Sequence, residues 1–317
     1  MRFEPIYQYR PWGGRRLEEL LSAPLPAGLV GEAWLLSDRE DHQSRVADGA
    51  LRGQTIAELR TRWPTQLLGS LAARFPRFPL LLKFLDARQV LSVQVHPSDR
   101  QAAEVGPGEC GKTEAWVVLE ASPDSFIYAG LKSGTTADDL RRAVAGTTVG
   151  DCLASFTPHV GDGVLLPAGT VHALGSGTVV FEVQQNSDLT YRLFDWDRAD
   201  PATGQRRELQ VDRALACTDF AAGPVVPVVP VGEDLLHCEQ FGVQRWSGQT
   251  RVRVGAEDTA RVVVCLSGAG RLEYDNRVFP LRMGDVLLVP AVVGACEFQP
   301  DPTAILLEVS LPEVSTP

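Results

Sequence analysis

The segment Gly161-Asp-Gly-Val-Leu-Leu-Pro-Ala168 is repeated almost residue for residue as Gly284-Asp-Val-Leu-Leu-Val-Pro-Ala291. In both copies Gly-Asp favours a tight turn, and the apolar run that follows favours a β-strand. Proline then ends the strand, because it has no backbone N–H with which to continue a hydrogen-bonded ladder. The sequence therefore predicts one turn-and-strand unit that occurs twice.

Short apolar runs rich in valine, leucine and phenylalanine surround both copies, and turn residues bound most of them. Runs of this kind favour an all-β sandwich or barrel over alternating strands and helices. They cover residues 78–85, 90–95, 178–183, 261–266 and 286–289. The fold class predicted from them is all-β with a few short helices.

Three short helices are expected between the strands. Thr55-Ile-Ala-Glu58 and Ser98-Asp-Arg-Gln101 match the capping box, in which two side chains three residues apart satisfy each other's backbone donors. The first helix is expected to run toward Trp63 and the second to end near Gly106, and residues 136–144 are the third candidate.

A domain boundary is predicted at residues 221–232, which contain three prolines and no charged residue. Such a run favours extended, polyproline-like geometry and suits a connector. The repeat has one copy on each side, and its pattern resembles a hairpin of the cupin jelly roll. We therefore expect tandem cupin (jelly-roll) barrels. Residues 1–220 would form the first domain, with N-terminal strands and a short helical insert at about 135–150, and residues 233–317 the second.

The chain has 317 residues with a formal net charge of −10, and 44% of its residues are hydrophobic. This composition is typical of a globular protein, and the negative charge makes nucleic acid and anionic membranes poor partners. No apolar run approaches the roughly 20 residues of a membrane helix, and residues 1–10 contain no apolar leader, so a cytoplasmic location is expected. The six cysteines form no Cys-x-x-Cys pair, so we expect neither a disulfide scaffold nor a zinc–thiolate site.

A polar face is predicted on the strand at residues 90–96. Because strand side chains alternate between faces, Ser92, Gln94 and His96 share one face, and the other face is apolar. Three polar groups in a row are costly if they are simply buried. They fit the lining of a barrel interior that contains a metal or a polar ligand.

The two copies of the repeat differ in one chemically important position. His172 follows the first copy, whereas Ala295 stands at the equivalent position after the second copy. No histidine occurs after His237. A histidine-bound metal is therefore expected in the first domain and not in the second.

A carboxylate completes the candidate metal site. Glu114 shares one face of the predicted strand 111–119 with Lys112 and Trp116. Two imidazoles with oxygen ligands suit a borderline divalent ion and leave at least one position for water or substrate. The four candidate ligands are Gln94, His96, Glu114 and His172.

Taken singly, each of these residues has a simpler interpretation. A histidine in a strand is more often a hydrogen-bonded structural residue than a metal ligand, and only the convergence of the four favours a metal. His42, His159 and His237 have no comparable context, and we interpret them as structural.

The chain resembles type I mannose-6-phosphate isomerases of the cupin superfamily, especially their short bacterial form. The resemblance covers about residues 5–200, and the C-terminal third matches weakly, as a degenerate cupin. The matching segments are Tyr9-Arg-Pro-Trp-Gly-Gly14, Gly31-Glu-Ala-Trp34 with Ser37-Asp38, Leu91-Ser-Val-Gln-Val-His-Pro97, Gly111-Lys-Thr-Glu-Ala-Trp116, Pro167-Ala-Gly-Thr-Val-His-Ala173 and Glu182-Val-Gln-Gln-Asn-Ser-Asp-Leu-Thr-Tyr-Arg192.

The resemblance implies one Zn²⁺ per chain, held by the four candidate ligands. It also implies that Ser92 and Lys112 contact the substrate phosphate and that Arg192 faces the sugar near the reacting carbons. This sequence departs from the family at Leu174, because longer members have a tyrosine two positions after the residue equivalent to His172. Whatever that hydroxyl contributes must come from elsewhere or be absent. The extra helical domain of the long forms is expected to be missing or reduced to the region around Thr136.

The implied activity is the interconversion of mannose 6-phosphate and fructose 6-phosphate through a cis-enediol. The metal would act as a Lewis acid on the developing oxyanion, and Arg192 would stabilise enediolate charge. Lys112 and Ser92 would orient the substrate through its phosphate. The general base stays open between a metal-bound hydroxide, Glu114 and His172. The candidate catalytic residues are therefore Arg192, Lys112, Glu114 and His172.

Three further functions are compatible with parts of this pattern. Two histidines and a carboxylate also serve Fe(II) dioxygenases, although a fourth protein ligand and the neighbouring lysine argue against that chemistry. The second function is that of a non-catalytic sugar-phosphate-binding cupin, and the third is that of a related isomerase acting on glucose 6-phosphate. The expected partner is a phosphorylated hexose, with no nucleic acid and no membrane, and the protein is expected to be a monomer or a homodimer.

Overall fold

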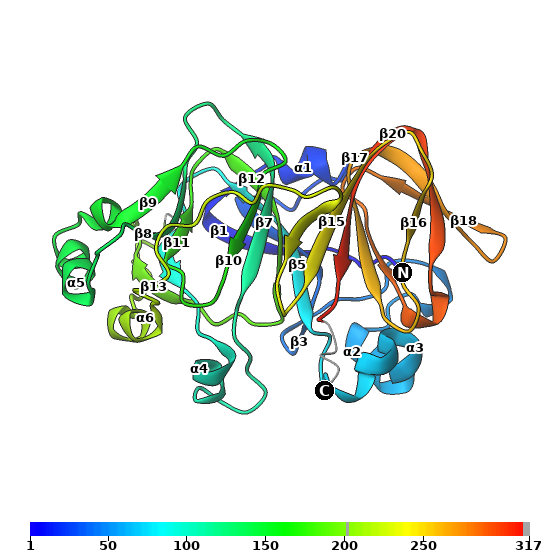
Figure 1. Cartoon of the computed structure of the whole chain (residues 1–317), viewed down its shortest axis with the longest axis horizontal. Helices are drawn as coiled ribbons and strands as arrows, with labels where there is room; N and C mark the ends of the chain where they lie inside the picture. Colours follow the sequence, from blue (N-terminus) through cyan, green and yellow to red (C-terminus); the bar gives the residue numbers. More distant parts are fainter. Residues whose placement is uncertain (201–202, 313–317) are drawn as a thin grey trace.

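The computed structural model describes residues 1–200 and 203–312, and strands connected by short helices make up most of it. The prediction of a mostly β fold is confirmed. Figure 1 shows two β-rich parts side by side, one formed before the segment 221–232 and one after it. None of the helices in the described ranges is both long enough and apolar enough to cross a membrane.

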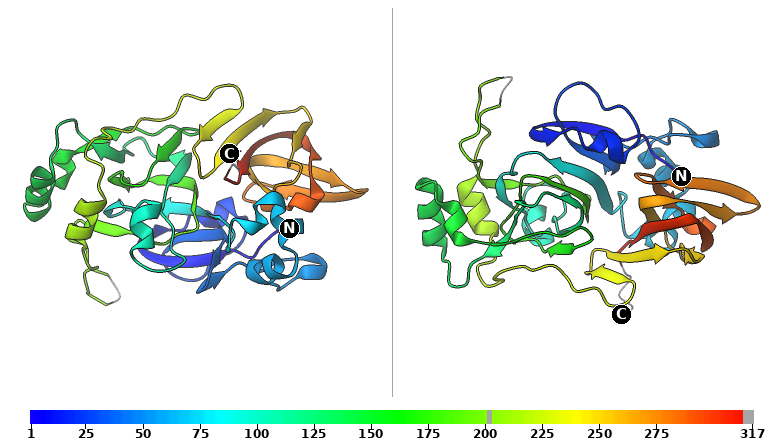
Figure 2. Two further views of the ribbon diagram at one scale, coloured as in Figure 1. Left: turned by 60° about the horizontal axis from the view of Figure 1, so that its bottom comes forward. Right: turned by 90° about the horizontal axis from the view of Figure 1, so that it is seen from above.

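The first part contains two antiparallel sheets that curve round a common interior (Figure 2, right). The six-stranded sheet has the order β1 (Ile6–Gly14), β2 (Val30–Leu36), β5 (Leu80–Ala87), β12 (Thr178–Gln185), β7 (Glu114–Ala121), β10 (Gly163–Leu166). The five-stranded sheet has the order β13 (Tyr191–Phe194), β6 (Val93–Val95), β11 (His172–Leu174), β8 (Ile127–Leu131), β9 (Leu153–Phe156).

The second part is one seven-stranded sheet built round two long central strands, β17 (Arg261–Tyr274) and β20 (Cys296–Ser310). The remaining strands are β14 (Asp234–His237), β15 (Gly242–Gly248), β16 (Val252–Val254), β18 (Arg277–Arg282) and β19 (Val286–Val289). A two-stranded sheet of β3 (Asp38–Arg39) and β4 (His42–Gln43) lies in the first part of the chain. The closure of each part into a barrel stays a prediction.

Both copies of the repeat form the predicted turn and strand. Gly161 and Gly284 adopt φ values of 93° and 87°, which lie in the left-handed region that glycine enters at little cost. The strands that follow are β10 and β19, and each ends immediately before a proline.

The three predicted helices are confirmed as α2 (Ile56–Arg62), α4 (Asp99–Ala103) and α5 (Ala137–Ala145), each opened by a capping box. The sequence reasoning missed the other helical segments. These are α1 (Leu17–Leu20), α3 (Pro64–Leu68), α6 (Val211–Cys217) and the 3₁₀ turns η1 (Gly49–Leu51), η2 (Gly69–Ala73), η3 (Val149–Cys152) and η4 (Ala291–Val293).

The cap of α2 allows a stability prediction. Thr55 Oγ1 accepts a hydrogen bond from the backbone N–H of Glu58 at 3.1 Å. We expect Thr55→Ala to lower the free energy of unfolding by about 1 kcal/mol, because that donor loses its partner. Urea denaturation would measure the change, with Thr65→Ala on the exposed side of α3 as the control. Equal midpoints for the two variants would contradict the assigned cap.

Two predicted strands begin later than expected, for a visible reason. Residues 90–92 precede β6, and the carbonyls of Val90 and Leu91 accept hydrogen bonds from the side chains of Arg198 and Trp196. Lys112 precedes β7, and its backbone N–H donates to the Pro97 carbonyl at 3.0 Å. Side chains and loops therefore occupy the groups that a longer strand ladder would use.

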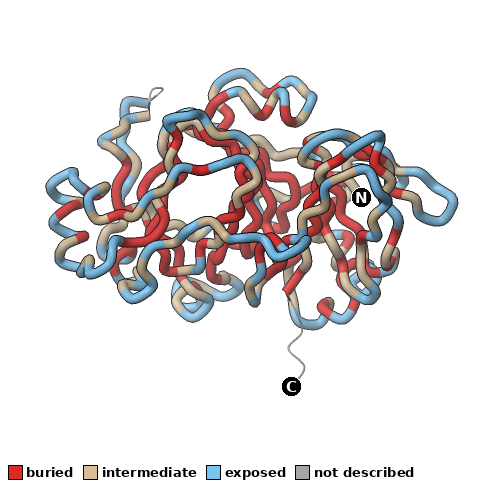
Figure 3. Tube along the Cα trace, turned by 45° about the horizontal axis from the view of Figure 1, so that its top comes forward, coloured by how far each residue is buried: buried red, intermediate tan, exposed pale blue. Residues whose placement is uncertain are grey.

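Residues 221–232 run along the first part, where Pro224 pairs with Gly130 and Val228 with Gly163. The largest buried apolar cluster includes residues from both sides of this segment, among them Leu17, Phe84, Phe241 and Leu307. Figure 3 shows the buried segments concentrated in the strands of both parts, with the exposed ones in the connecting loops. The two parts consequently share one hydrophobic core.

Candidate active site

The histidines and the carboxylate predicted as ligands come together in the interior of the first part. Gln94 on β6 is the direct neighbour of His172 on β11, and His96 follows β6 at once. Glu114 opens β7 in the six-stranded sheet, so it reaches the group from the other sheet. Ligand atoms of His96, Glu114 and His172 all lie within 4.8 Å of one another, and all three residues are buried.

Backbone carbonyls orient both imidazoles. Nδ1 of His96 donates to the Leu189 carbonyl at 2.9 Å, and Nδ1 of His172 donates to the Thr170 carbonyl at 2.8 Å. With the proton held on Nδ1, the lone pair of each Nε2 points to the other side of the ring. This is the arrangement in which proteins present histidine to a metal.

The charges in the cluster favour an ionised Glu114 carboxylate and a neutral His96 imidazole. Burial by itself raises the pKa of Glu114, but the surrounding positive charge, chiefly the ammonium of Lys112, outweighs it and holds the pKa well below its usual value. Burial, followed by the charge of Lys112, lowers the pKa of His96 to about 3. Lys112 Nζ lies 2.6 Å from Glu114 Oε2 and 3.0 Å from His96 Nε2.

Two facing atoms, Glu114 Oε1 and His172 Nε2, show whether a cation fits between the side chains. Glu114 Oε1 is buried with no hydrogen-bond donor among the described residues, and it lies 3.1 Å from His172 Nε2. Since Nδ1 of His172 carries a proton, both atoms present lone pairs and repel each other. A proton on Nε2 or a metal ion between the ligands satisfies both, so the donor set fits a divalent metal.

A series of side-chain contacts leads from the cluster toward solvent, through Gln94, Ser92 and Arg192. The amide nitrogen of Gln94 lies 3.3 Å from His172 Nε2, and its oxygen lies 3.2 Å from Ser92 Oγ. Arg192, the Cα neighbour of Gln94 on β13, donates from Nε to Ser92 Oγ at 3.1 Å. Every site residue predicted from the sequence therefore lies in one connected group.

A cavity of about 450 Å³ adjoins this group, and four neighbouring strands line one side of it with alternating charge. Arg10 on β1 pairs with Glu32 on β2 at 2.7 Å, and Lys83 on β5 pairs with Glu182 on β12 at 2.9 Å. Burial raises the pKa of Glu32, but Arg10 and Lys83 outweigh it and lower the pKa to about 2.

Sequence reasoning missed this row of charges, although Lys83 and Glu182 left a signal. Each is the single charged residue in a run of apolar neighbours, Leu-Leu-Leu-Lys-Phe-Leu and Val-Val-Phe-Glu-Val. Both strands are buried along their whole length. A buried strand with one charge needs a partner of opposite sign on the next strand.

Leu174 and the other histidines lie apart from this chemistry. Leu174 is buried in the apolar cluster that also contains Trp116. His159 is exposed and faces Asp162, and His42 packs against the ring of Trp34 at 4.9 Å. His237 lines a different cavity.

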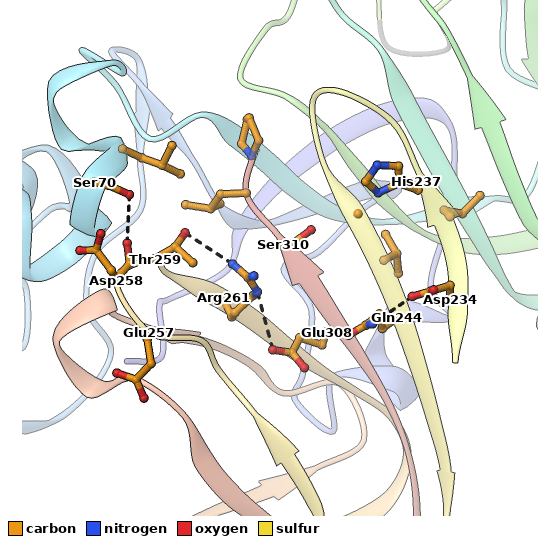
Figure 4. Close-up of a pocket in the computed structure, with 16 residues that line it drawn as sticks. Ser70, Asp234, His237, Gln244, Glu257, Asp258, Thr259, Arg261, Glu308 and Ser310 are labelled. Atoms are coloured by element: carbon orange, nitrogen blue, oxygen red, sulfur yellow. Dashed lines mark hydrogen bonds and ion pairs between the residues drawn. The ribbon is translucent and has the colours of Figure 1, made fainter. Parts of the chain in front are cut away.

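That other cavity is larger, at about 750 Å³, and lies between the seven-stranded sheet and η2 (Figure 4). The Arg261 guanidinium lies 3.9 Å from Glu308 in its wall. Among the charged residues of this lining the carboxylates outnumber the one arginine and disfavour a phosphate ester, whereas arginines and lysines outnumber the carboxylates in the cavity of about 450 Å³. The carboxylates of the larger cavity are Asp234, Glu257, Asp258 and Glu308.

Comparisons with known proteins agree with this geometry. Residues 1–117 match the family model described as phosphomannose isomerase type I, catalytic domain. Mannose-6-phosphate isomerase ManA of Bacillus subtilis strain 168 is 35% identical over 301 residues, which cover 92% of this chain and 93% of that protein. A mannose-6-phosphate isomerase of Streptococcus mutans is 32% identical over 298 residues, 92% of each chain. The crystal structure of mannose 6-phosphate isomerase from Bacillus subtilis superposes with a TM-score of 0.88 at 28% identity, covering 98% of this chain and 99% of that one.

Proposed function

The chain belongs to the type I phosphomannose isomerase family of metal-dependent aldose–ketose isomerases, and we propose that it interconverts mannose 6-phosphate and fructose 6-phosphate at the His96–Glu114–His172 cluster. The single observation that carries the choice of site is the cluster itself. It unites two oriented imidazoles and a buried carboxylate beside a cavity in whose lining arginine and lysine side chains outnumber the carboxylates.

We propose Zn²⁺ as the metal, one per chain, with Gln94, His96, Glu114 and His172 as its protein ligands. Two imidazoles and two oxygen ligands without a thiolate suit zinc and leave room for substrate. The role of Gln94 requires its amide oxygen, which here accepts from Ser92, to turn toward the cluster. When bound, the metal supplies Lewis-acid stabilisation of the negative charge that develops on the substrate oxygen.

The chain's own residues bind and orient the sugar phosphate. Ser92 and Arg192 line the cavity next to Gln94, and Arg192 supplies a fixed guanidinium for enediolate charge. Lys112 was expected at the phosphate, but its Nζ is held between Glu114 and His96. We propose that Lys112 acts at the reacting end of the substrate instead. Glu114 and His172 remain the candidate protein groups for proton transfer.

We also propose where the domains begin and end, and which of them contains the active site. Residues 1–220 would form the catalytic domain, residues 221–232 the linker, and residues 233–317 a domain without metal ligands, in which Ala295 stands at the position of His172. A cytoplasmic location suits six cysteines that are all free thiols. A monomer or homodimer remains the expected state.

Turnover should depend on the metal. We expect chelation to reduce conversion of mannose 6-phosphate to the background rate and added zinc to restore it, because the oxyanion loses its main stabilisation. A coupled assay on purified protein measures the rate, and circular dichroism before and after chelation checks that the protein stays folded. Folded, metal-loaded protein without turnover would contradict the proposed function. In that case oxygen uptake would indicate the dioxygenase, tight substrate binding alone the non-catalytic binder, and turnover of glucose 6-phosphate the related isomerase.

A further inference from the structure

A loop after β13 is attached firmly to the segment that carries Ser92. Trp196 and Asp197 adopt φ values of 55° and 54°, so the chain turns sharply there. Trp196 Nε1 donates to the Leu91 carbonyl at 2.7 Å, and Arg198 Nη1 donates to the Val90 carbonyl at 2.8 Å. The base of the loop is therefore fixed relative to Ser92, even though the loop leaves the sheet.

The same loop returns to the cavity with a second arginine. Residues 207–210 run beside β13, where the Glu208 carbonyl accepts from Arg192 Nη1 at 3.3 Å and Gln210 N donates to the Arg192 carbonyl at 2.8 Å. Arg207 lies at the start of this stretch and lines the cavity together with Arg192. Two guanidiniums from different segments thus face one cavity.

Asp195 fixes the orientation of Arg207. Its Oδ2 accepts from Arg207 Nε at 2.8 Å and its Oδ1 from Arg207 Nη2 at 2.5 Å, which is the bidentate geometry of a fork-like ion pair. Oδ1 also accepts from Arg198 Nη2 at 2.5 Å. Asp195 is buried, so this arrangement is not a mobile surface contact.

The arginines of this loop and of β13 carry more positive charge and more hydrogen-bond donors than their partners in the protein satisfy. Arg198 and Arg207 both pair with the carboxylate of Asp195, whereas the guanidinium of Arg192 pairs with no carboxylate among the described residues. Burial, followed by the charge of Arg207, lowers the pKa of Arg192. Arg207 Nη1 and Arg192 Nη2 have no hydrogen-bond partner in the part of the chain that the structure describes. Asp188 and Asp200 also line the cavity, and the charge of Asp188 acts on Lys83 and Arg10.

We propose that Arg207 is a substrate-binding residue that, with Arg192, receives the phosphate of the sugar substrate, and that Asp195 is the positioning residue that holds it there. A phosphate ester accepts several hydrogen bonds from planar guanidinium forks, which matches two neighbouring arginines with donors directed into a cavity. The proposal rests on the proposed function and refines it. It places the phosphate at the rim formed by the loop, away from the ammonium of Lys112 at the ligand cluster.

Arg206 provides a matched control for the test. Arg206 precedes Arg207, but it is exposed, pairs with Asp197 at 2.9 Å and does not line the cavity. We expect Arg207→Ala to raise KM for mannose 6-phosphate roughly 10- to 100-fold with kcat changed by less than about threefold, because a charged hydrogen bond to the phosphate is lost in both ground and transition states. Arg206→Ala should match the unmodified enzyme.

Binding of inorganic phosphate, measured by calorimetry, should weaken in Arg207→Ala by a similar factor. Asp195→Asn should raise KM in the same direction, because Arg207 loses its bidentate partner. If Arg207→Ala unfolds, Arg207→Lys keeps a positive charge beside Asp195 but loses the fork, and it should raise KM by a smaller factor. Unchanged KM and unchanged phosphate affinity in folded Arg207 variants would overturn the proposal. Failure of the proposed function is distinguishable, because it would appear as absent turnover in the unmodified, metal-loaded enzyme.

Discussion

Glu114→Gln should lower kcat/KM by about a thousandfold or more and remove the bound metal. The substitution keeps the size of the side chain but deletes the one negative charge among the proposed ligands. Several kcal/mol of transition-state stabilisation depend on the metal, and each 1.4 kcal/mol corresponds to a tenfold change in rate. Elemental analysis of the purified variant and a steady-state assay would measure the two effects.

Glu120→Gln is the matched control for this variant. Glu120 lies on the same strand, β7, but its side chain is half exposed and pairs with Arg16 at the surface. We expect metal content and turnover of this control to equal those of the unmodified enzyme. A Glu114→Gln protein that retained both stoichiometric metal and most of its turnover would exclude Glu114 as a ligand.

Lys83→Met should destabilise the fold by about 3–5 kcal/mol, because removal of one partner leaves a buried charge without compensation. Lys83 Nζ lies 2.9 Å from Glu182 Oε1, and it donates to Gln184 Oε1 at 2.6 Å. Burial lowers the pKa of Lys83, but Glu182 and Glu32 outweigh it and keep the lysine charged. Urea denaturation of the metal-loaded protein would give the change in unfolding free energy.

The double variant Lys83→Met/Glu182→Gln separates the ion pair from simple loss of packing. The amide introduced by Glu182→Gln would still offer an oxygen to Trp116 Nε1, which now donates to Glu182 at 2.9 Å. We therefore expect the double variant to be more stable than Lys83→Met alone, although it carries one more substitution. If the loss of unfolding free energy in the double variant equalled the sum of the losses in Lys83→Met and Glu182→Gln, the two side chains would not be coupled.

The sequence was sufficient to predict the features that depend on local pattern. The repeated turn and strand, the capped helices and the polar face around Gln94 each have a signature within a few residues, and the structure contains all of them. The sequence also singled out His96, Glu114 and His172, which the structure brings together, because these polar residues stand among apolar neighbours.

Features that depend on contacts between distant residues could not be predicted from the sequence. The late start of β6 follows from Trp196 and Arg198, which lie about a hundred residues away and donate to the carbonyls of the residues that precede the strand. Arg207 gave no signal, because an arginine in a polar loop usually faces solvent. Only the path of the chain back along β13 brings it to the cavity.

The shared hydrophobic core has an evolutionary consequence. Apolar residues that follow the segment 221–232, such as Phe241 and Leu307, pack with Leu17 and Phe84, so we expect selection on them to act mainly through the amount of folded protein. Substitutions there should leave the catalytic constants of the surviving molecules intact while cellular proteases clear the unfolded fraction. Which substitutions this region tolerates would then depend on how long the folded protein persists in the cell. The residues around the candidate active site would be limited by catalysis as well.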